Sequence, residues 1–255
     1  MHVAFNSIDY YHIAFRDHGL MNPLSEDRLL ILAGHCGLGP ESRILDVGSG
    51  KGRASLLLCR KWRCYSVQVD ISEQWTSTAR KLFEEQGLQH RTEIRCEDAA
   101  KSSHAPHSFD LAVCLGTALL YGGISSAMRN LTKLVRIGGH IILGEPSLDG
   151  NPPLRFRQYL DRTGWLIHSS RALLRIMDEN RCRLLWSLRS TGEEWDRYMG
   201  MQWNAIHEYA RQHPGDRQAQ YFLEWCRDEQ ESYLRYQRHH LDWNVFLLRV
   251  GNCRI

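Results

Sequence analysis

The sequence predicts an α/β fold in which a doubly wound sheet of seven strands carries helices on both faces. Three observations predict it. Strand-like and helix-like segments alternate from about residue 43 to residue 145. The fourth candidate strand, residues 109–115, is apolar along nearly its whole length, as in a sheet that is covered on both sides. A glycine-rich turn, residues 48–52, follows the first strand. The length of 255 residues and the hydrophobic content of 43% fit one such domain with an insertion.

The first four strands are expected at residues 43–47, 64–69, 92–96 and 109–115. The first and the fourth are apolar runs, and the second is rich in β-branched residues. Strands separated by helices at this spacing require right-handed crossovers, so these four should run parallel.

Two helices connect the first three strands. One spans residues 54–62, directly after the glycine-rich turn. The other follows Ser72, a good N-cap residue, and ends at Gly87, a residue typical of helix C-termini.

The second half of the chain has a looser pattern, interrupted at Asn151-Pro152-Pro153. The remaining elements of the sheet domain are expected as a helix at 125–135, a strand at 140–143, a helix at 170–179 and strands at 182–188 and 243–250.

A helical cap is expected between the last two strands. Trp195, Tyr198 and Gln202 recur at helical spacing, and His213-Pro214-Gly215 divides two helices. The domain boundaries are therefore expected as follows: 1–42, an N-terminal lid and first helix; 43–192, the cofactor-binding α/β core; 193–242, the helical cap; 243–255, the last core strand and the C-terminus.

Charge and cysteine content exclude several classes of protein. The net charge is +3 and acidic residues are interleaved with the arginines, which argues against a nucleic-acid partner. The eight cysteines include no Cys-x-x-Cys pair, so we expect reduced thiols and no metal site. The sequence has no signal peptide and no apolar run of about 20 residues, so we expect a soluble, cytoplasmic protein without membrane contact.

The glycine-rich turn has the features of a cofactor-binding loop. Gly48, Gly50 and Gly52 allow positive φ angles and close approach of a ligand to the backbone. The following helix directs free N–H groups toward this site. Asp70 ends the second strand, where a carboxylate can accept both hydroxyls of a ribose.

Two other nucleotide sites fit this loop less well. Nicotinamide dinucleotide sites have the pattern Gly-x-Gly-x-x-Gly, whereas this loop has one residue between each pair of glycines. The Walker phosphate loop requires Gly-Lys-Ser/Thr, but Lys51 is followed by Gly52. Asp46, just before the first glycine, also argues against a dehydrogenase.

Five segments resemble the motifs of class I S-adenosylmethionine-dependent methyltransferases, which have a Rossmann-like sheet. They are Ile44–Gly52 (motif I), Val69–Ser72 (the ribose motif), Glu97–Ala100 (the adenine segment), Phe109–Gly116 (the fourth-strand motif) and Gly138–Ile141 (the turn into the fifth strand). The resemblance covers roughly residues 20 to 148. Beyond them, Gly192–Tyr198 and Trp203 are similar to a bacterial small-molecule branch, as are Asn22-Pro23 and Gly144–Pro146.

The resemblance implies S-adenosylmethionine as the cofactor and S-adenosylhomocysteine as its product. It places Asp98 against the adenine amino group. The residues expected to bind the cofactor are Asp46, Gly48, Ser49, Gly50, Gly52, Asp70, Ile71, Asp98, Ala99, Leu115 and Gly116.

The acceptor is expected outside the carboxyl ends of the strands, beneath the cap. The residues expected to contact it are Tyr11, Tyr121, Glu145, Trp195 and Tyr198. The candidate catalytic residues are Glu145, Tyr121 and His18. Each has a structural alternative: the cap aromatics can be packing residues, Glu145 can anchor the Pro146 turn, and His18 can be a surface histidine.

The expected reaction is transfer of a methyl group to a small-molecule acceptor by in-line displacement, for which alignment can supply most of the rate. The Asn/Asp-Pro-Pro-Tyr/Phe motif of many nucleic-acid methyltransferases is absent from the sequence. Aminopropyl transfer or cyclisation, cofactor binding without catalysis, and an RNA or protein acceptor remain alternatives. We expect a monomer or a homodimer.

Overall fold

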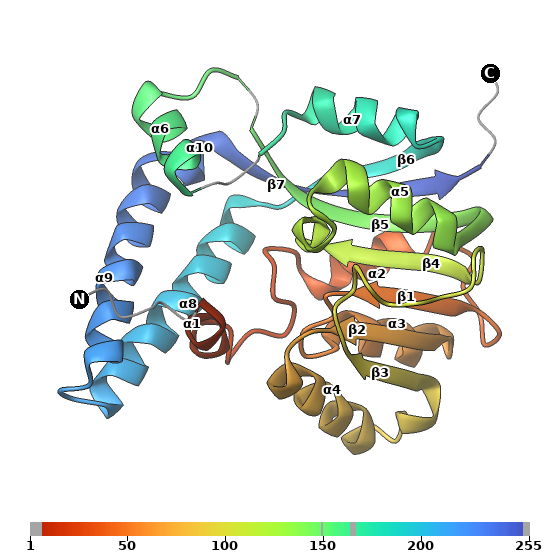
Figure 1. Ribbon diagram of the computed structural model, residues 1–255, viewed down its shortest axis with the longest axis horizontal. Helices are drawn as coiled ribbons and strands as arrows, with labels where there is room; N and C mark the ends of the chain where they lie inside the picture. The colour runs from red at the N-terminus through yellow and green to blue at the C-terminus, as the bar shows by residue number, and fades with distance from the viewer. Residues whose placement is uncertain (1–6, 149, 164–166, 252–255) are drawn as a thin grey trace.

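A computed structural model describes residues 7–148, 150–163 and 167–251 (Figure 1). Its centre is a seven-stranded sheet in the order β3-β2-β1-β4-β5-β7-β6. The strands are β1 (Arg43–Val47), β2 (Tyr65–Asp70), β3 (Thr92–Cys96), β4 (Phe109–Leu115), β5 (Val135–Leu148), β6 (Cys182–Arg189) and β7 (Leu241–Val250). Only β7 is antiparallel to its neighbours. The predicted doubly wound α/β fold is confirmed.

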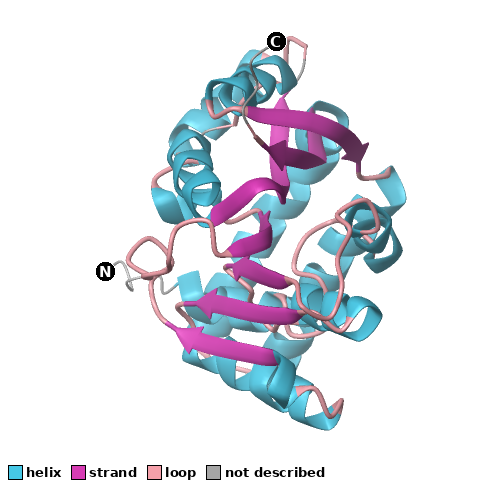
Figure 2. Ribbon diagram, turned by 90° about the vertical axis from the view of Figure 1, so that its right-hand side faces the viewer, coloured by secondary structure: helices cyan, strands magenta, loops and turns pink. Residues whose placement is uncertain are grey.

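Helices cover both faces of the sheet, as Figure 2 shows. They are α1 (Ser7–Ala14), α2 (Glu26–Ala33), α3 (Arg53–Trp62), α4 (Glu73–Glu85), α5 (Ile124–Leu134), α6 (Leu154–Thr163), α7 (Ser170–Glu179), α8 (Gly192–Gln212), α9 (Arg217–Ser232) and α10 (Arg238–His240), with short turns η1 (Gln89–Arg91), η2 (Ala118–Tyr121) and η3 (Tyr233–Gln237). One core cluster packs the sheet against α5 and α7, and a second packs its other face against α2, α3 and α4.

The strand β5 is longer than residues 140–143. It pairs antiparallel with β7 as far as Leu148 opposite Leu241, so both strands extend beyond their apolar segments. The sequence also gave no sign of α6. This helix is held by Phe156 and Leu160, which pack against Leu241 in a small separate cluster.

The cap consists of α8 and α9, together with α1 from the other end of the chain (Figure 1). Tyr10 and Ala14 of α1 are buried against Ile206 of α8 and Phe222 and Cys226 of α9. Helix α2, by contrast, packs on the sheet. The first 42 residues therefore divide between the cap and the core.

A capping box fixes the start of α8 and joins it to the N-terminal segment. The Thr191 hydroxyl accepts the Glu194 N–H, and a Glu194 carboxylate oxygen accepts the Thr191 N–H. Glu194 also accepts the Ser25 N–H at 3.0 Å and pairs with Arg28 at 2.6 Å. The cap is thus attached to the start of α2.

Within the described residues, no helix combines the length and the apolar character needed to cross a membrane. The cysteines among these residues are free thiols; Cys253 lies outside them.

Candidate active site

In the turn between β1 and α3, the backbone lies close to residues that follow or end other strands. Gly48 has a φ of 63°, and its N–H donates to the Val69 carbonyl at 2.8 Å. A Cβ on Gly48 would lie 2.4 Å from Cγ2 of Thr117, which follows β4. Glycine is therefore needed here both for conformation and for space.

Asp70 connects this turn to the end of β2. Its Oδ2 accepts the Gly50 N–H at 2.8 Å, and its Oδ1 accepts the Ser72 N–H at 2.9 Å. Burial raises the pKa of Asp70, and the hydrogen bonds from Ser72 and Gly50 oppose that shift. Each oxygen keeps a lone pair for a ligand hydroxyl.

Asp46 is the second buried carboxylate of the site. The Ser55 hydroxyl donates to its Oδ2 at 2.7 Å. Burial raises the pKa of Asp46 to about 6, despite that hydrogen bond. This carboxyl group therefore changes its charge within two pH units of neutrality.

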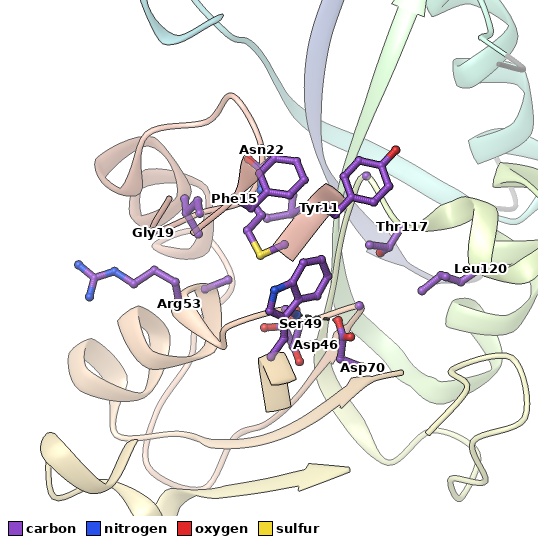
Figure 3. A pocket seen from close by; sticks show the side chains of 18 of the residues that line it. Tyr11, Phe15, Gly19, Asn22, Asp46, Ser49, Arg53, Asp70, Thr117 and Leu120 are labelled. Atoms are coloured by element: carbon purple, nitrogen blue, oxygen red, sulfur yellow. Dashed lines mark hydrogen bonds between the residues drawn. The ribbon is translucent and has the colours of Figure 1, made fainter. Parts of the chain in front are cut away.

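A cavity of about 440 Å³ lies at the carboxyl ends of β1, β2 and β4. Figure 3 shows Asp46, Ser49 and Asp70 on one side of it and Phe15 and Asn22 on the opposite side. Ten of the residues predicted from the sequence line it: Tyr11, Asp46, Gly48, Ser49, Gly50, Asp70, Ile71, Leu115, Gly116 and Tyr198.

Three predicted cofactor residues lie outside this lining. A Cβ on Gly52 would meet Gln68 Oε1 at 2.6 Å and Ala79 Cβ at 2.9 Å, so this glycine serves packing of α3 beside α4. Asp98 accepts the Ala100 N–H and pairs with Lys101, and Ala99 is buried in the core. The predicted adenine contact of Asp98 stays a prediction.

The candidate catalytic residues also lie outside the cavity lining. Tyr121 packs against the core cluster on the α5 side of the sheet. His18 contacts the Tyr198 carbonyl through Nε2 at 3.0 Å, and burial lowers the pKa of His18. Trp195, the remaining acceptor candidate, packs beside the Tyr198 ring with its indole N–H buried and unpartnered.

Glu145 lies at the carboxyl end of β5, behind η2. It accepts a hydrogen bond from the Ala118 backbone, while its Oε1 is buried without a partner. Burial raises the pKa of Glu145 to about 7. The carboxylate is thus next to the turn that borders the cavity, but not in its wall.

The sequence left several lining side chains unassigned, among them Phe15, Met21, Asn22, Trp75 and Trp243. Asn22 belongs to a segment that resembles the bacterial small-molecule branch, and Trp75 follows the ribose motif by one helical turn. Trp243 gave no signal, because it reaches the site only through pairing of β7 with β5. Its ring fills the space that side chains at Gly116 and Gly144 would occupy.

Two contacts fasten the N-terminal segment over the cavity. Lys51 Nζ donates to the carbonyls of Phe15 and Arg16 at 2.8 and 3.0 Å. His12 Nε2 and Ser72 Oγ lie 2.8 Å apart, directly beside Asp70. The roof of the cavity is therefore tied to both cofactor-binding turns.

The lining fits S-adenosylmethionine in size and chemistry. The volume falls in the usual range for small-molecule sites. The Ser49 hydroxyl is buried without a partner, and Asp46 and Asp70 present carboxylates suited to an ammonium group and to ribose hydroxyls. Ile71 and Trp75 add apolar surface for an adenosine.

Known proteins match this chain, two of them over more than nine tenths of its length. The family model described as a methyltransferase domain matches residues 44–139. A methyltransferase of Geobacter sulfurreducens in complex with S-adenosylhomocysteine superposes with a TM-score of 0.86 at 26% identity, over 95% of this chain and 98% of that one. The uncharacterized protein YjhP of Escherichia coli is 25% identical over 93% of this chain and 96% of its own length.

A third relative matches about half of the chain. A sarcosine/dimethylglycine N-methyltransferase of Halorhodospira halochloris is 30% identical over 129 residues, which are 49% of this chain and 45% of that enzyme. The motifs in residues 44–139, the order of the strands and the position of the cavity at the strand ends all fit a methyltransferase. Residues 44–139 therefore form a methyltransferase domain, and the chain as a whole has the fold of S-adenosylmethionine-dependent methyltransferases.

Proposed function

We propose that the protein methylates a small-molecule acceptor. The observation that carries the proposal is the roof of the cavity: Tyr11 and Phe15 of the N-terminal segment and Tyr198 of α8 line it opposite the cofactor loops. A macromolecular acceptor needs an open surface at this position, whereas here the cap and α1 lie over the strand ends (Figure 1). The named substrates of the Halorhodospira halochloris relative are also small molecules.

Different residues of the cavity are assigned to S-adenosylmethionine and to the acceptor. We assign Asp70 to the ribose hydroxyls and Asp46 to the methionine ammonium group. The backbone of Gly48–Gly50 lines the cavity beside these two groups. When bound, S-adenosylmethionine supplies a methyl group on a positively charged sulfur, which keeps the electron pair of the breaking bond. Tyr11, Leu120 and Tyr198 then exclude water and align the acceptor.

Product analysis tests the proposal. Purified protein is incubated with S-adenosylmethionine and a panel of small amines, phenols, carboxylates and thiols, and the nucleoside product is identified. S-adenosylhomocysteine with a methylated panel member supports the proposal. Methylthioadenosine instead would indicate aminopropyl transfer, tight binding without turnover a non-catalytic role, and methylation of RNA or protein alone a macromolecular acceptor.

Acidification is expected to weaken cofactor binding through Asp46. Because burial raises the pKa of Asp46 to about 6, the carboxylate becomes neutral as the pH falls through that value and loses its attraction for the ammonium group. The Kd for S-adenosylmethionine, measured by calorimetry between pH 7.5 and 5, should rise by up to about tenfold per pH unit below 6. Asp46→Asn should bind weakly at every pH. A flat profile in the unmodified protein would contradict the assignment.

Glu145 has two possible roles, and the geometry favours positioning of η2 over proton transfer. A glutamine at this position still accepts the Ala118 N–H, so Glu145→Gln should retain a methyl-transfer rate within about threefold of the original at pH 6 to 9. Glu145→Ala should be slower, because η2 loses its anchor. If Glu145 is instead the general base, Glu145→Gln loses about 100-fold or more and the rise in rate through pH 7 disappears.

A further inference from the structure

The acceptor side of the cavity is walled by aromatic rings. Tyr11 stacks on Phe15 with ring centroids 5.7 Å apart, and Phe15 lies 5.9 Å from the ring of Tyr198. All three line the cavity, and they come from α1, the residue that follows it, and α8. Aromatic faces carry negative electrostatic potential and attract organic cations.

Positive side chains around the cavity are already paired. Among the lining residues that the structure describes, Arg53 is the one basic side chain, and its Nε and Nη2 bind both oxygens of Glu26 at 2.6 and 2.8 Å. Lys51 of the glycine-rich turn is bound to the Phe15 and Arg16 carbonyls. An anionic acceptor would therefore find no unpaired cation in this part of the described lining.

A carboxylate of the cap, outside the cavity lining, acts electrostatically on two of these rings. Glu229 of α9 is half-buried and accepts the Tyr159 hydroxyl at 2.9 Å. It is close enough to Tyr11 and Tyr198 to contribute to the raised pKa of both hydroxyls, after burial itself. Asp46 and Asp70 are assigned to the cofactor and Glu145 to η2, and Glu229 is the carboxylate that acts on both Tyr11 and Tyr198.

We propose that the acceptor is a small organic cation, an amine whose ammonium group lies against Tyr11, Phe15 and Tyr198 with Glu229 as the nearby counter-charge. The proposal rests on the proposed function and adds the class of acceptor to it. The aromatic faces select for charge and size, and the carboxylate compensates the repulsion that a cationic acceptor meets beside the sulfonium. Before transfer the ammonium group releases one proton to solvent. The freed nitrogen electron pair then forms the new bond to the methyl carbon while the S–CH3 bond breaks, and the electron pair of that bond stays on sulfur.

Three probes of nearly equal shape test the charge preference. Choline, 3,3-dimethylbutan-1-ol and 3,3-dimethylbutanoate are cationic, neutral and anionic, and each is titrated into the protein loaded with S-adenosylhomocysteine. Choline should bind about tenfold or more tightly than the neutral alcohol, and the carboxylate should not bind. Equal binding of choline and the alcohol would overturn the proposal. So would tightest binding of the carboxylate, especially if Arg197→Gln, which alters the neighbouring pocket, removed it.

Variants separate the ring face from the hydroxyl and from the charge. Tyr11 is 40% exposed, so substitution there should leave the fold intact. Tyr11→Phe should keep the affinity for choline, and Tyr11→Leu should lower it about tenfold. Glu229→Gln should lower it severalfold, while Glu231→Gln, an exposed neighbour paired with Arg235, should leave it unchanged. Equal affinity in Tyr11→Leu and Tyr11→Phe would refute the aromatic contact, even if Glu229→Gln failed to fold.

The same titrations distinguish this inference from the proposed function. Loss of S-adenosylhomocysteine binding would remove the basis of both. Normal S-adenosylhomocysteine binding with methylation of phenols or thiols, and no preference for choline, would leave the small-molecule methyltransferase in place and refute only the cationic acceptor.

Discussion

Replacing Asp70 with alanine is expected to weaken S-adenosylmethionine binding by about 100-fold or more. Hydrogen bonds to a charged group contribute roughly 1.5–3 kcal/mol each, and two ribose hydroxyls would lose theirs. The change also releases the N–H groups of Gly50 and Ser72, which hold both cofactor turns in place. Calorimetric titration measures the effect, and thermal unfolding verifies that the variant folds.

Two further variants show how much of that loss is specific to the Asp70 carboxylate. Asp70→Asn keeps one acceptor oxygen and should give an intermediate affinity. Glu73→Ala removes an exposed carboxylate three residues along the chain, which pairs with Arg80, and should change the Kd by less than about threefold. If Asp70→Ala bound as tightly as Glu73→Ala, Asp70 would not be the ribose ligand.

The second large effect is expected on stability, from Gly52→Ala. Gly52 has a φ of 74°, where a side chain costs roughly 1–2 kcal/mol, and the new Cβ would press on Ala79 and Gln68 at a further cost of roughly 1–3 kcal/mol. The free energy of unfolding, measured with urea, should therefore fall by about 2–5 kcal/mol.

Gly37 offers a matched control, because its φ is 63° and no atom lies within 4 Å of a Cβ built on it. Gly37→Ala should cost only the backbone part, about 1–2 kcal/mol. The difference between the two variants measures the packing of α3 beside α4. Equal losses would mean that Gly52 is required for its conformation alone.

Local signals in the sequence were enough to predict which residues of the glycine-rich turn and of β2 lie at the cavity. Asp46, Gly48, Gly50 and Asp70 stand at the ends of two apolar strands, and the structure brings all four to the cavity. Parallel strands end at the same edge of a sheet, so a chemical pattern at strand ends translates directly into a place in space.

The acceptor side depends on contacts between distant segments. Trp243 enters the cavity through its pairing opposite Pro146, and Tyr198 enters because α8 packs on α1. These contacts join segments that are far apart in the sequence, so the residue pattern of one segment does not predict them. The direction of Tyr121 was equally hidden, since it is set by the short turn η2, which points the ring to the core instead of the cavity.

Gly52 shows that a correct motif can hide a different physical role. The sequence assigned it to the cofactor together with Gly48 and Gly50, and its spacing is the same. The structure gives it the neighbours Gln68 and Ala79 instead. A motif records that a glycine is needed, and only the packing shows which atoms require it.

Lys51 couples the order of the glycine-rich loop to the order of the roof of the cavity. Its side chain belongs to the loop that faces the cofactor, and its hydrogen bonds end on the backbone of the roof above the acceptor. A ligand that orders either part lowers the entropic cost of ordering the other, and such coupling is reciprocal. An acceptor that holds the roof shut would therefore retain the nucleoside as well, and the nucleoside product would be released after the methylated one.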